Sequence, residues 1–206
     1  GHTGMLADYT DTETYSMMLI ESGLRVTHVS THVSLREACN LVTTENVLET
    51  IRVTKAGLER LGVEDPTIAV AGLNPHAGED GLLGEEDTSE IGPAVEEAQA
   101  DGLDVVGPIP PDTVYVKAAA GEYDCVVSMY HDQGHIPIKM LGFDSKTAVS
   151  GVNMTVGLPI IRTSVDHGTA FDIAGKGMAS ASSMVDAVEV AAQVANADGA
   201  DSDTDA

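Results

Sequence analysis

The sequence is poor in basic residues, and this shortage excludes several classes of protein. Lys and Arg account for 10 of its 206 residues, against 33 Asp and Glu, which gives a formal net charge of -23 at pH 7. A surface of this charge repels nucleic-acid phosphates and anionic lipid headgroups, so we expect neither a nucleic-acid nor a membrane partner. An anionic substrate would therefore need a local cationic pocket.

Cysteine and long apolar runs are also scarce. Cys39 and Cys125 lie far apart and outside any C-x-x-C pattern, so the sequence indicates neither a disulfide framework nor a thiolate zinc site. No apolar run reaches membrane-spanning length, and the first residues resemble no secretion signal, which predicts a cytoplasmic protein. The chain begins without Met, so we expect it to be part of a longer gene product.

The acidic residues are spread along the whole chain, and two interpretations account for them. A halophilic protein carries such charge as a solvated surface, whereas an acidic interaction protein concentrates it in low-complexity blocks with few aliphatic residues. Because 43% of the residues are hydrophobic, and a low-complexity acidic block occurs only at 196–206, we favour the interpretation as a halophilic protein. The range 196–206 is predicted to be a disordered acidic tail.

Aliphatic β-rich runs alternate with segments of helical periodicity, which predicts an α/β fold with helices covering a sheet. The helix expected at 44–61 has Thr43 or Thr44 as its N-cap and Gly62 as its terminator. Further helices are expected at 86–100 with a break at Gly92-Pro93, from 112 or 113 to 121, and at 180–195. Strands are expected at 24–31, 67–72, 104–107 and 125–129, and extended segments at 147–154 and 159–164.

Three histidines lie at or just after the ends of three predicted strands, at His32, His76 and His131. Ligands of open α/β sheets gather at the carboxyl ends of the strands, so these side chains can converge although they are far apart in sequence. Three imidazoles suffice to bind a divalent metal that keeps open coordination sites. The alternative is that each histidine only caps a turn.

Two more histidines and a carboxylate lie near these three in the sequence. His28 lies inside a predicted strand and alternates with valines, so we expect a structural role for it. His135 stays unassigned. Asp132, next to His131, is a direct metal ligand, a carboxylate that orients the histidine, or a helix cap.

The few cations and one glycine-rich segment complete the candidate site. Lys139 and Arg162 lie close in sequence to the suspected loops and would suit an anionic substrate, although each taken alone is more often a surface residue. The segment 164–177 combines glycines with small polar residues, which is typical of a loop that binds a phosphate or a nucleotide. A plain turn would explain it equally well.

Several long motifs of the chain closely resemble the 4-hydroxythreonine-4-phosphate dehydrogenase family. They occur in the family's order from residue 1 to about 195, so the resemblance identifies 1–195 as the C-terminal portion of a longer two-domain enzyme. The motifs are Gly1-His2-Thr3, Thr31-His32, 72–79 (GLNPHAGE), Gly107-Pro108 with Pro111-Asp112-Thr113, 129–134 (MYHDQG) and 157–170 (GLPIIRTSVDHGTA).

The resemblance implies a fold related to isocitrate and isopropylmalate dehydrogenases, with helices packed on a mixed sheet, and not a Rossmann fold. It implies NAD or NADP as cofactor and a divalent metal, Zn, Mg, Mn or Co. Family members are homodimers whose metal is bound at the subunit interface by three histidines, which match His32, His76 and His131. The substrate is a small phosphorylated hydroxy acid.

The resemblance also assigns roles to individual residues. Lys139 and Asp112 would handle protons in catalysis, with Asp132 beside the metal ligand His131. The remaining matches contact substrate or cofactor: His2, Thr3, Lys139, Asn153 and Arg162 for the substrate, and His167, Gly168, Thr169 and Ala170 for the cofactor.

The implied reaction is the oxidative decarboxylation of 4-phosphooxy-threonine (4-hydroxythreonine-4-phosphate) to 3-amino-2-oxopropyl phosphate, as in pyridoxal phosphate biosynthesis. A dehydrogenase for 4-phospho-D-threonate or D-erythronate is the nearest alternative, and a zinc hydrolase or an inactive truncated metal-binding module are others. The chain departs from the family pattern in three ways. It lacks the N-terminal portion of its relatives, has Gly4 in place of an acidic residue, and has a longer stretch at 144–150.

Overall fold

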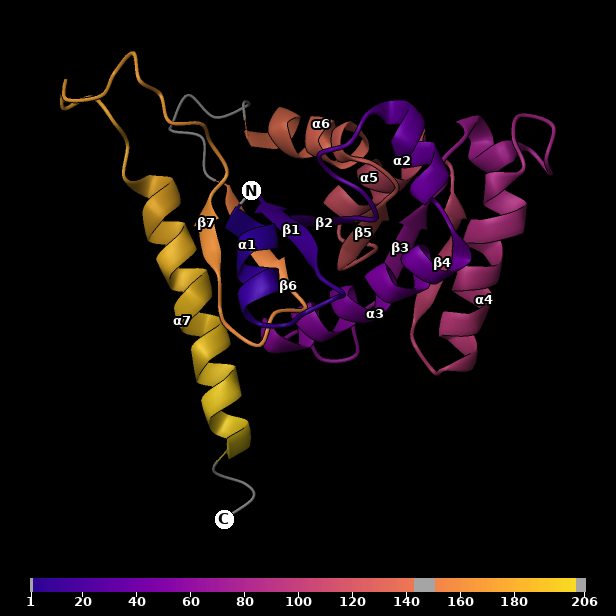
Figure 1. The fold of residues 1–206 in the computed structure, drawn as a ribbon, viewed down its shortest axis with the longest axis horizontal. Coiled ribbons are helices and arrows are strands. Elements are labelled where there is room, and N and C mark those ends of the chain that lie inside the picture. The colour runs from indigo at the N-terminus through magenta and orange to yellow at the C-terminus, as the bar shows by residue number, and fades with distance from the viewer. Residues whose placement is uncertain (1, 143–150, 203–206) are drawn as a thin grey trace.

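The computed structural model describes residues 2–142 and 151–202, which form a mixed seven-stranded sheet with helices on both faces (Figure 1). The strand order is β4-β3-β5-β2-β1-β6-β7. Strands β4, β3, β5 and β2 run parallel, β1 is antiparallel to both β2 and β6, and β7 is antiparallel to β6. The strands are β1 (Ser16–Glu21), β2 (Leu24–His28), β3 (Ile68–Ala71), β4 (Val105–Ile109), β5 (Cys125–Ser128), β6 (Val152–Val156) and β7 (Thr163–Val165).

The helices form a layer on each face of this sheet, as the α/β prediction requires. In Figure 1, α5 and α6 lie above the sheet and α3 lies below it, while α7 runs along β7 at the left. The helices are α1 (His2–Tyr9), α2 (Leu35–Leu41), α3 (Thr44–Arg60), α4 (Gly92–Ala100), α5 (Pro111–Ala119), α6 (His131–Gly142) and α7 (Ser182–Ser202), with a 3-10 turn η1 (Pro75–Gly78) and a π-helical turn η2 (Asp87–Ile91).

Alternation along the central strands divides the core between these two layers. Ile68 and Val70 of β3 pack with α3 and α4, whereas Ala69 and Ala71 pack with α5 and α6. Successive strand side chains point to opposite faces, so a strand buried on both sides is apolar throughout. The loops that follow β2, β3 and β5 therefore start from strands that are packed on both faces.

Helix α3 forms where the sequence predicts it, within one residue at its end. The Thr43 hydroxyl accepts a hydrogen bond from the Asn46 amide at 3.2 Å, and Gly62 follows the helix with a φ of 77°. Gly57 lets the helix approach the sheet closely, since a Cβ there would lie 2.3 Å from Cγ1 of Val156. Any larger residue at Gly57 would push α3 off β6.

Other predicted boundaries need correction. The sequence predicts no helix directly after the strand at 125–129, but α6 runs from His131 to Gly142 and carries Lys139. Gln133 anchors its first turn by accepting from the Met129 amide at 2.6 Å and donating to the Gly72 carbonyl at 2.7 Å. The strand β1 and the helices α1 and α2 were not predicted. The predicted long stretch 144–150 lies outside the described residues.

The C-terminal helix also extends beyond its expected end. We predicted that it ends at Ala195 and that a disordered tail begins at Asn196, but α7 continues to Ser202. Alanine has the highest helix propensity, and the alanines at 195, 197 and 200 favour continuation of the helix. Residues 203–206 of the predicted tail lie outside the described part. Among the described helices, none combines the length and the apolar composition needed to cross a membrane.

Candidate active site

A cavity of about 1030 Å³ lies beyond the carboxyl ends of β2 and β5 and extends along β6 and β7. Because β2 and β5 are parallel neighbours, the loops that leave them open on the same edge of the sheet. Many of the predicted site residues line this cavity: His2, Thr3, His32, His131, Asn153, Arg162, His167 and Gly168.

His32 and His131 approach each other at the wall of this cavity. Their ring centroids are 5.8 Å apart with the ring planes at 47°. With a metal–nitrogen bond of about 2.1 Å, two imidazoles on one ion have centroids at most roughly 6.5 Å apart, so this pair fits a shared divalent ion. Their donor chemistry fits too, since imidazole suits Zn, Co and other divalent ions.

Asp132 fixes which nitrogen of His131 is available. Its Oδ1 lies 2.6 Å from Nδ1 of His131, and a carboxylate can only accept, so Nδ1 carries the proton. The lone pair of His131 is then on Nε2, as in the carboxylate–histidine–metal arrangements of many metal sites. This geometry favours the orienting role among the three considered for Asp132.

His76 lies apart from this pair within one chain. It is exposed on η1 in the left-handed conformation, with φ 54° and ψ 28°, and it does not line the cavity. Among the residues that the structure describes, no three His, Cys, Asp or Glu side chains gather to hold a metal ion. One chain therefore brings together His32 and His131 but not the third predicted ligand.

The loop that presents His76 is held by Asp87, which the sequence did not single out. Asp87 is fully buried, and its carboxylate accepts from the backbone amides of Leu73 at 2.8 Å and Asn74 at 3.1 Å. It also accepts from Nδ2 of Asn74 at 2.9 Å. Three bonds to a buried carboxylate fix the turn before His76, so the exposed position of His76 is built into the fold.

Arg162 is the cation that faces the cavity. It is half-buried and donates weakly to Oδ1 of Asn153 at 3.5 Å and to Oγ1 of Thr155 at 3.4 Å. No carboxylate of the described residues forms an ion pair with it, and burial lowers its pKa from the usual value. A half-buried guanidinium without an acidic partner is suited to bind a phosphate or carboxylate.

Lys139 is placed differently from Arg162. Its Nζ pairs with Oδ2 of Asp166 at 2.6 Å and also contacts the Asp166 carbonyl. Asp166 lines the cavity, whereas Lys139 lies on α6 behind it. The structure therefore adds Asp166 to the candidate site, and Lys139 reaches the cavity through this carboxylate.

The remaining predicted residues lie at the edge of the cavity or away from it. Thr169 and Ala170 are exposed and do not line it, although they directly follow His167 and Gly168, which do. Asp112 is exposed in the first turn of α5 and does not line it either. Helix α5 contacts η1, so Asp112 belongs to the same side of the molecule as His76.

Two further histidines, His28 and His135, line the cavity next to His131. The His135 ring stacks on the His131 ring, with centroids 3.6 Å apart and planes at 10°, and His28 lies 4.8 Å from His135. His28 is buried within β2, as predicted for a structural histidine, and burial lowers its pKa to about 3. Burial also lowers the pKa of His135. Burial therefore favours the neutral form of both rings.

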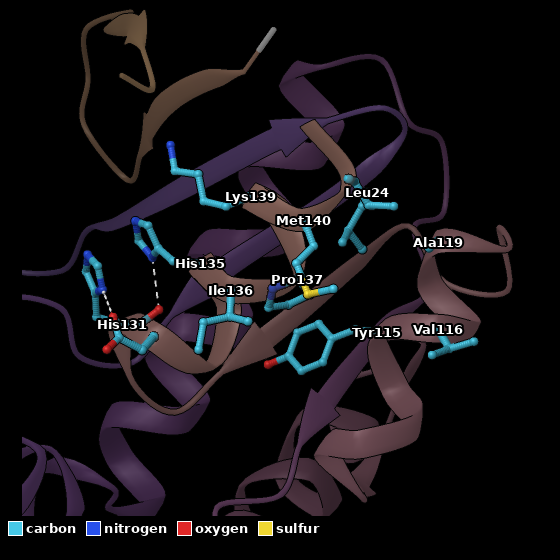
Figure 2. A pocket seen from close by; sticks show the side chains of 12 residues that line it. Leu24, Tyr115, Val116, Ala119, His131, His135, Ile136, Pro137, Lys139 and Met140 are labelled. Atoms are coloured by element: carbon cyan, nitrogen blue, oxygen red, sulfur yellow. Dashed lines mark hydrogen bonds and ion pairs between the residues drawn. The ribbon is translucent and has the colours of Figure 1, made fainter. Parts of the chain in front are cut away.

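A second, apolar groove of about 1180 Å³ lies between α5 and α6 (Figure 2). Figure 2 shows His131 and His135 at one end of it and Val116 at the other. Three large apolar side chains in it are mostly exposed, with Val116 at 70%, Ile136 at 58% and Met140 at 71%. Apolar patches of this kind on a highly charged surface mark interaction sites.

Comparison with known proteins gives consistent matches over nearly the whole chain. Residues 1–191 match the family described as "Pyridoxal phosphate biosynthetic protein PdxA". The D-threonate 4-phosphate dehydrogenase of Salmonella typhimurium is 52% identical to this chain, and that of Pectobacterium atrosepticum is 51% identical. Each match covers 95% of this chain and 58% of the relative. The crystal structure of 4-hydroxythreonine-4-phosphate dehydrogenase from Klebsiella pneumoniae superimposes with a TM-score of 0.83 at 49% identity, covering 95% of this chain and 57% of that one. The chain thus spans less than two thirds of these relatives.

Proposed function

The chain belongs to the PdxA family, and from this membership and the geometry of the cavity we propose that it carries the active site of an NAD(P)-dependent, metal-dependent dehydrogenase. One observation supports this proposal most strongly. Arg162, which forms no ion pair with any described residue, lines the same cavity as the imidazole pair of His32 and His131. An anion-binding group and a metal-binding group in one cavity are what oxidation of a phosphorylated hydroxy acid requires.

We propose D-threonate 4-phosphate as the substrate. The curated relatives with this name are 52% and 51% identical to the chain. The name 4-hydroxythreonine-4-phosphate dehydrogenase comes from solved structures at 49%, 51% and 50% identity, so the identities are similar and the names of the curated relatives decide our choice. The second compound is therefore the second candidate. The two substrates differ in the group on C2, a hydroxyl in the first and an amine in the second.

The residues of the cavity divide the work of binding and proton transfer. Arg162, with His2 and Asn153 nearby, would neutralise the substrate's phosphate and carboxylate, and the segment from Ser164 to Gly168 would bind the nicotinamide cofactor. A divalent metal, when bound, supplies the Lewis acidity that favours loss of the hydroxyl proton before hydride transfer and the loss of carbon dioxide after it.

Proton handling falls to Lys139 and Asp166. Their ion pair at the edge of the cavity offers a proton on Nζ and an acceptor on Oδ2. The carbon that loses carbon dioxide must take up a proton from a donor that is held in place, and Asp166 holds the Lys139 ammonium. Asp132 keeps Nδ1 of His131 protonated, which leaves Nε2 for the metal.

The third metal ligand would come from a second copy of the chain. His76 lies apart from His32 and His131 in one chain, and α5, which contacts η1, also forms one wall of the apolar groove. Pairing of two copies through the groove would cover its exposed apolar side chains and bring η1 of each copy towards the partner. A twofold axis then gives two equal sites.

Substitution in the groove tests this dimer. We expect Met140→Asp to convert a dimer into a monomer, because a charge buried in an apolar interface is strongly unfavourable. Light scattering at high salt measures the mass. Met184→Asp on α7, where the methionine is 56% exposed, is the matched control and should leave the dimer intact. A dimeric Met140→Asp protein would contradict this interface.

Turnover with a small panel of substrates tests the function. We expect NAD(P)+ reduction, followed at 340 nm, with D-threonate 4-phosphate in molar salt, and loss of that activity with chelator and its return with Mg2+, Mn2+, Co2+ or Zn2+. Faster turnover of 4-hydroxythreonine-4-phosphate would support the second candidate. No turnover of either compound with any of these metals would contradict the proposed function.

A further inference from the structure

We propose that His135, supported by His28, is a positioning residue that holds the His131 ring in the orientation needed to bind the metal. This inference rests on the proposed metal site. It concerns two histidines for which the motifs of the chain assign no role in binding or catalysis.

The contact between His135 and His131 restrains the face of the ligand ring. The two rings are nearly parallel, with 10° between their planes and 3.6 Å between their centroids. Asp132 already restrains rotation within the ring plane through Nδ1 at 2.6 Å. With the edge held by Asp132 and the face held by His135, the Nε2 lone pair of His131 has one direction in which to point.

His135 is itself held in two ways. Its Nδ1 lies 2.9 Å from the backbone carbonyl of His131, which can only accept, so Nδ1 donates and the ring is locked against its own helix turn, as Figure 2 shows. The His28 ring also packs against it, with the centroids 4.8 Å apart, and lies 6.4 Å from the His131 ring. A stacked ring that could swing freely would restrain nothing, and the packing against His28 holds the ring even when the hydrogen bond is removed.

His28 provides a fixed support because it belongs to the sheet. Its side chain is 2% exposed, and Nδ1 lies 3.3 Å from the carbonyl of Met17 on the neighbouring strand. The first turn of α6 is pressed against it, since a Cβ on Gly134 would lie 2.6 Å from Nε2 of His28. Contacts of His28 with His135, and of His135 with His131, therefore connect β2 to the metal ligand.

Two substitutions at His135 separate stacking from hydrogen bonding. His135→Phe keeps a flat ring but loses the Nδ1 donor, whereas His135→Gln keeps an N–H donor but loses the ring. If stacking positions His131, His135→Gln should weaken Co2+ binding by about 10–100-fold, the usual effect of removing a residue that orients a metal ligand. His135→Phe should keep a Co2+ affinity within about threefold of wild type. Isothermal titration of the chain with Co2+ gives the affinity, and the visible Co2+ spectrum reports the ligand geometry.

Controls distinguish failure of this inference from failure of the metal site. If wild type does not bind Co2+, or if His131→Ala binds it equally well, the metal site itself is wrong. If His131→Ala loses binding while His135→Gln keeps the wild-type affinity and spectrum, the site stands and the positioning role is overturned. Equal weakening in His135→Phe and His135→Gln variants that keep the wild-type far-UV CD spectrum would also overturn the stacking role.

A pair of substitutions at His28 tests its packing against His135. His28→Phe, which keeps a flat ring, should bind Co2+ more tightly than His28→Leu. Equal affinities or the reverse order would contradict the role of His28.

Discussion

The His76→Ala variant should lose metal-dependent activity by more than about 100-fold, since even residues that only orient a metal ligand contribute 10–100-fold. His76 is exposed on a 3-10 turn that the buried Asp87 holds from beneath, so its side chain is not needed for the fold. We therefore expect a far-UV CD spectrum close to that of wild type. Dehydrogenase assays at saturating metal measure the loss.

A neighbouring substitution controls for the unusual backbone at His76. Glu79 is also exposed and left-handed, with φ 46°, so Glu79→Ala perturbs the same loop without removing an imidazole. It should retain most of the activity. If His76→Ala stays as active as Glu79→Ala, His76 is not a metal ligand and the proposed site must be rebuilt from His32 and His131 alone.

The Arg162→Gln variant should raise KM for the phosphorylated substrate by about 10–100-fold, because a hydrogen bond to a charged group contributes about 1.5–3 kcal/mol. Arg162 is half-buried at the cavity and has no acidic partner among the described residues, so its charge is available to a ligand. The rise in KM should exceed that caused by the loss of one exposed charge. The chain carries a net charge of -23 and has few other cations that could replace the positive charge of Arg162.

Arg52 provides the matched control for this substitution. It is exposed on α3 and pairs with Asp101 at 2.6 Å, away from the cavity. Arg52→Gln changes the net charge equally and should leave KM within about twofold, as expected for an exposed ion pair. Similar KM values for the two variants would show that general electrostatics, and not a contact with Arg162, governs binding. Arg162→Lys should fall between wild type and Arg162→Gln.

Much of the fold could be predicted because its signals are local. Helix α3 combines a threonine cap, a regular apolar face and a terminal glycine, so each feature points to the same boundaries. The meeting of His32 and His131 follows from a general rule about the carboxyl ends of parallel strands. In both cases the information lies within a short segment or in a property that all such sheets share.

The parts that could not be predicted depend on contacts between distant segments. The pairing of Lys139 with Asp166 joins residues that are 27 positions apart, and nothing near either residue indicates it. Asp87 resembles any acid in a helical pattern until the turn before His76 is seen to bind it. The contact between the His28 and His135 rings likewise joins a strand to a helix. Sequence patterns cannot specify such pairs.

Mixing two inactive variants tests the central claim, that each site takes His131 from one chain and His76 from another. His76→Ala and His131→Ala should each be inactive alone. When they are unfolded and refolded together, about half of the dimers are mixed and each mixed dimer has one complete site, so about a quarter of the wild-type activity should return. Mixed dimers, verified by two affinity tags, that stay as inactive as either parent would contradict the shared site.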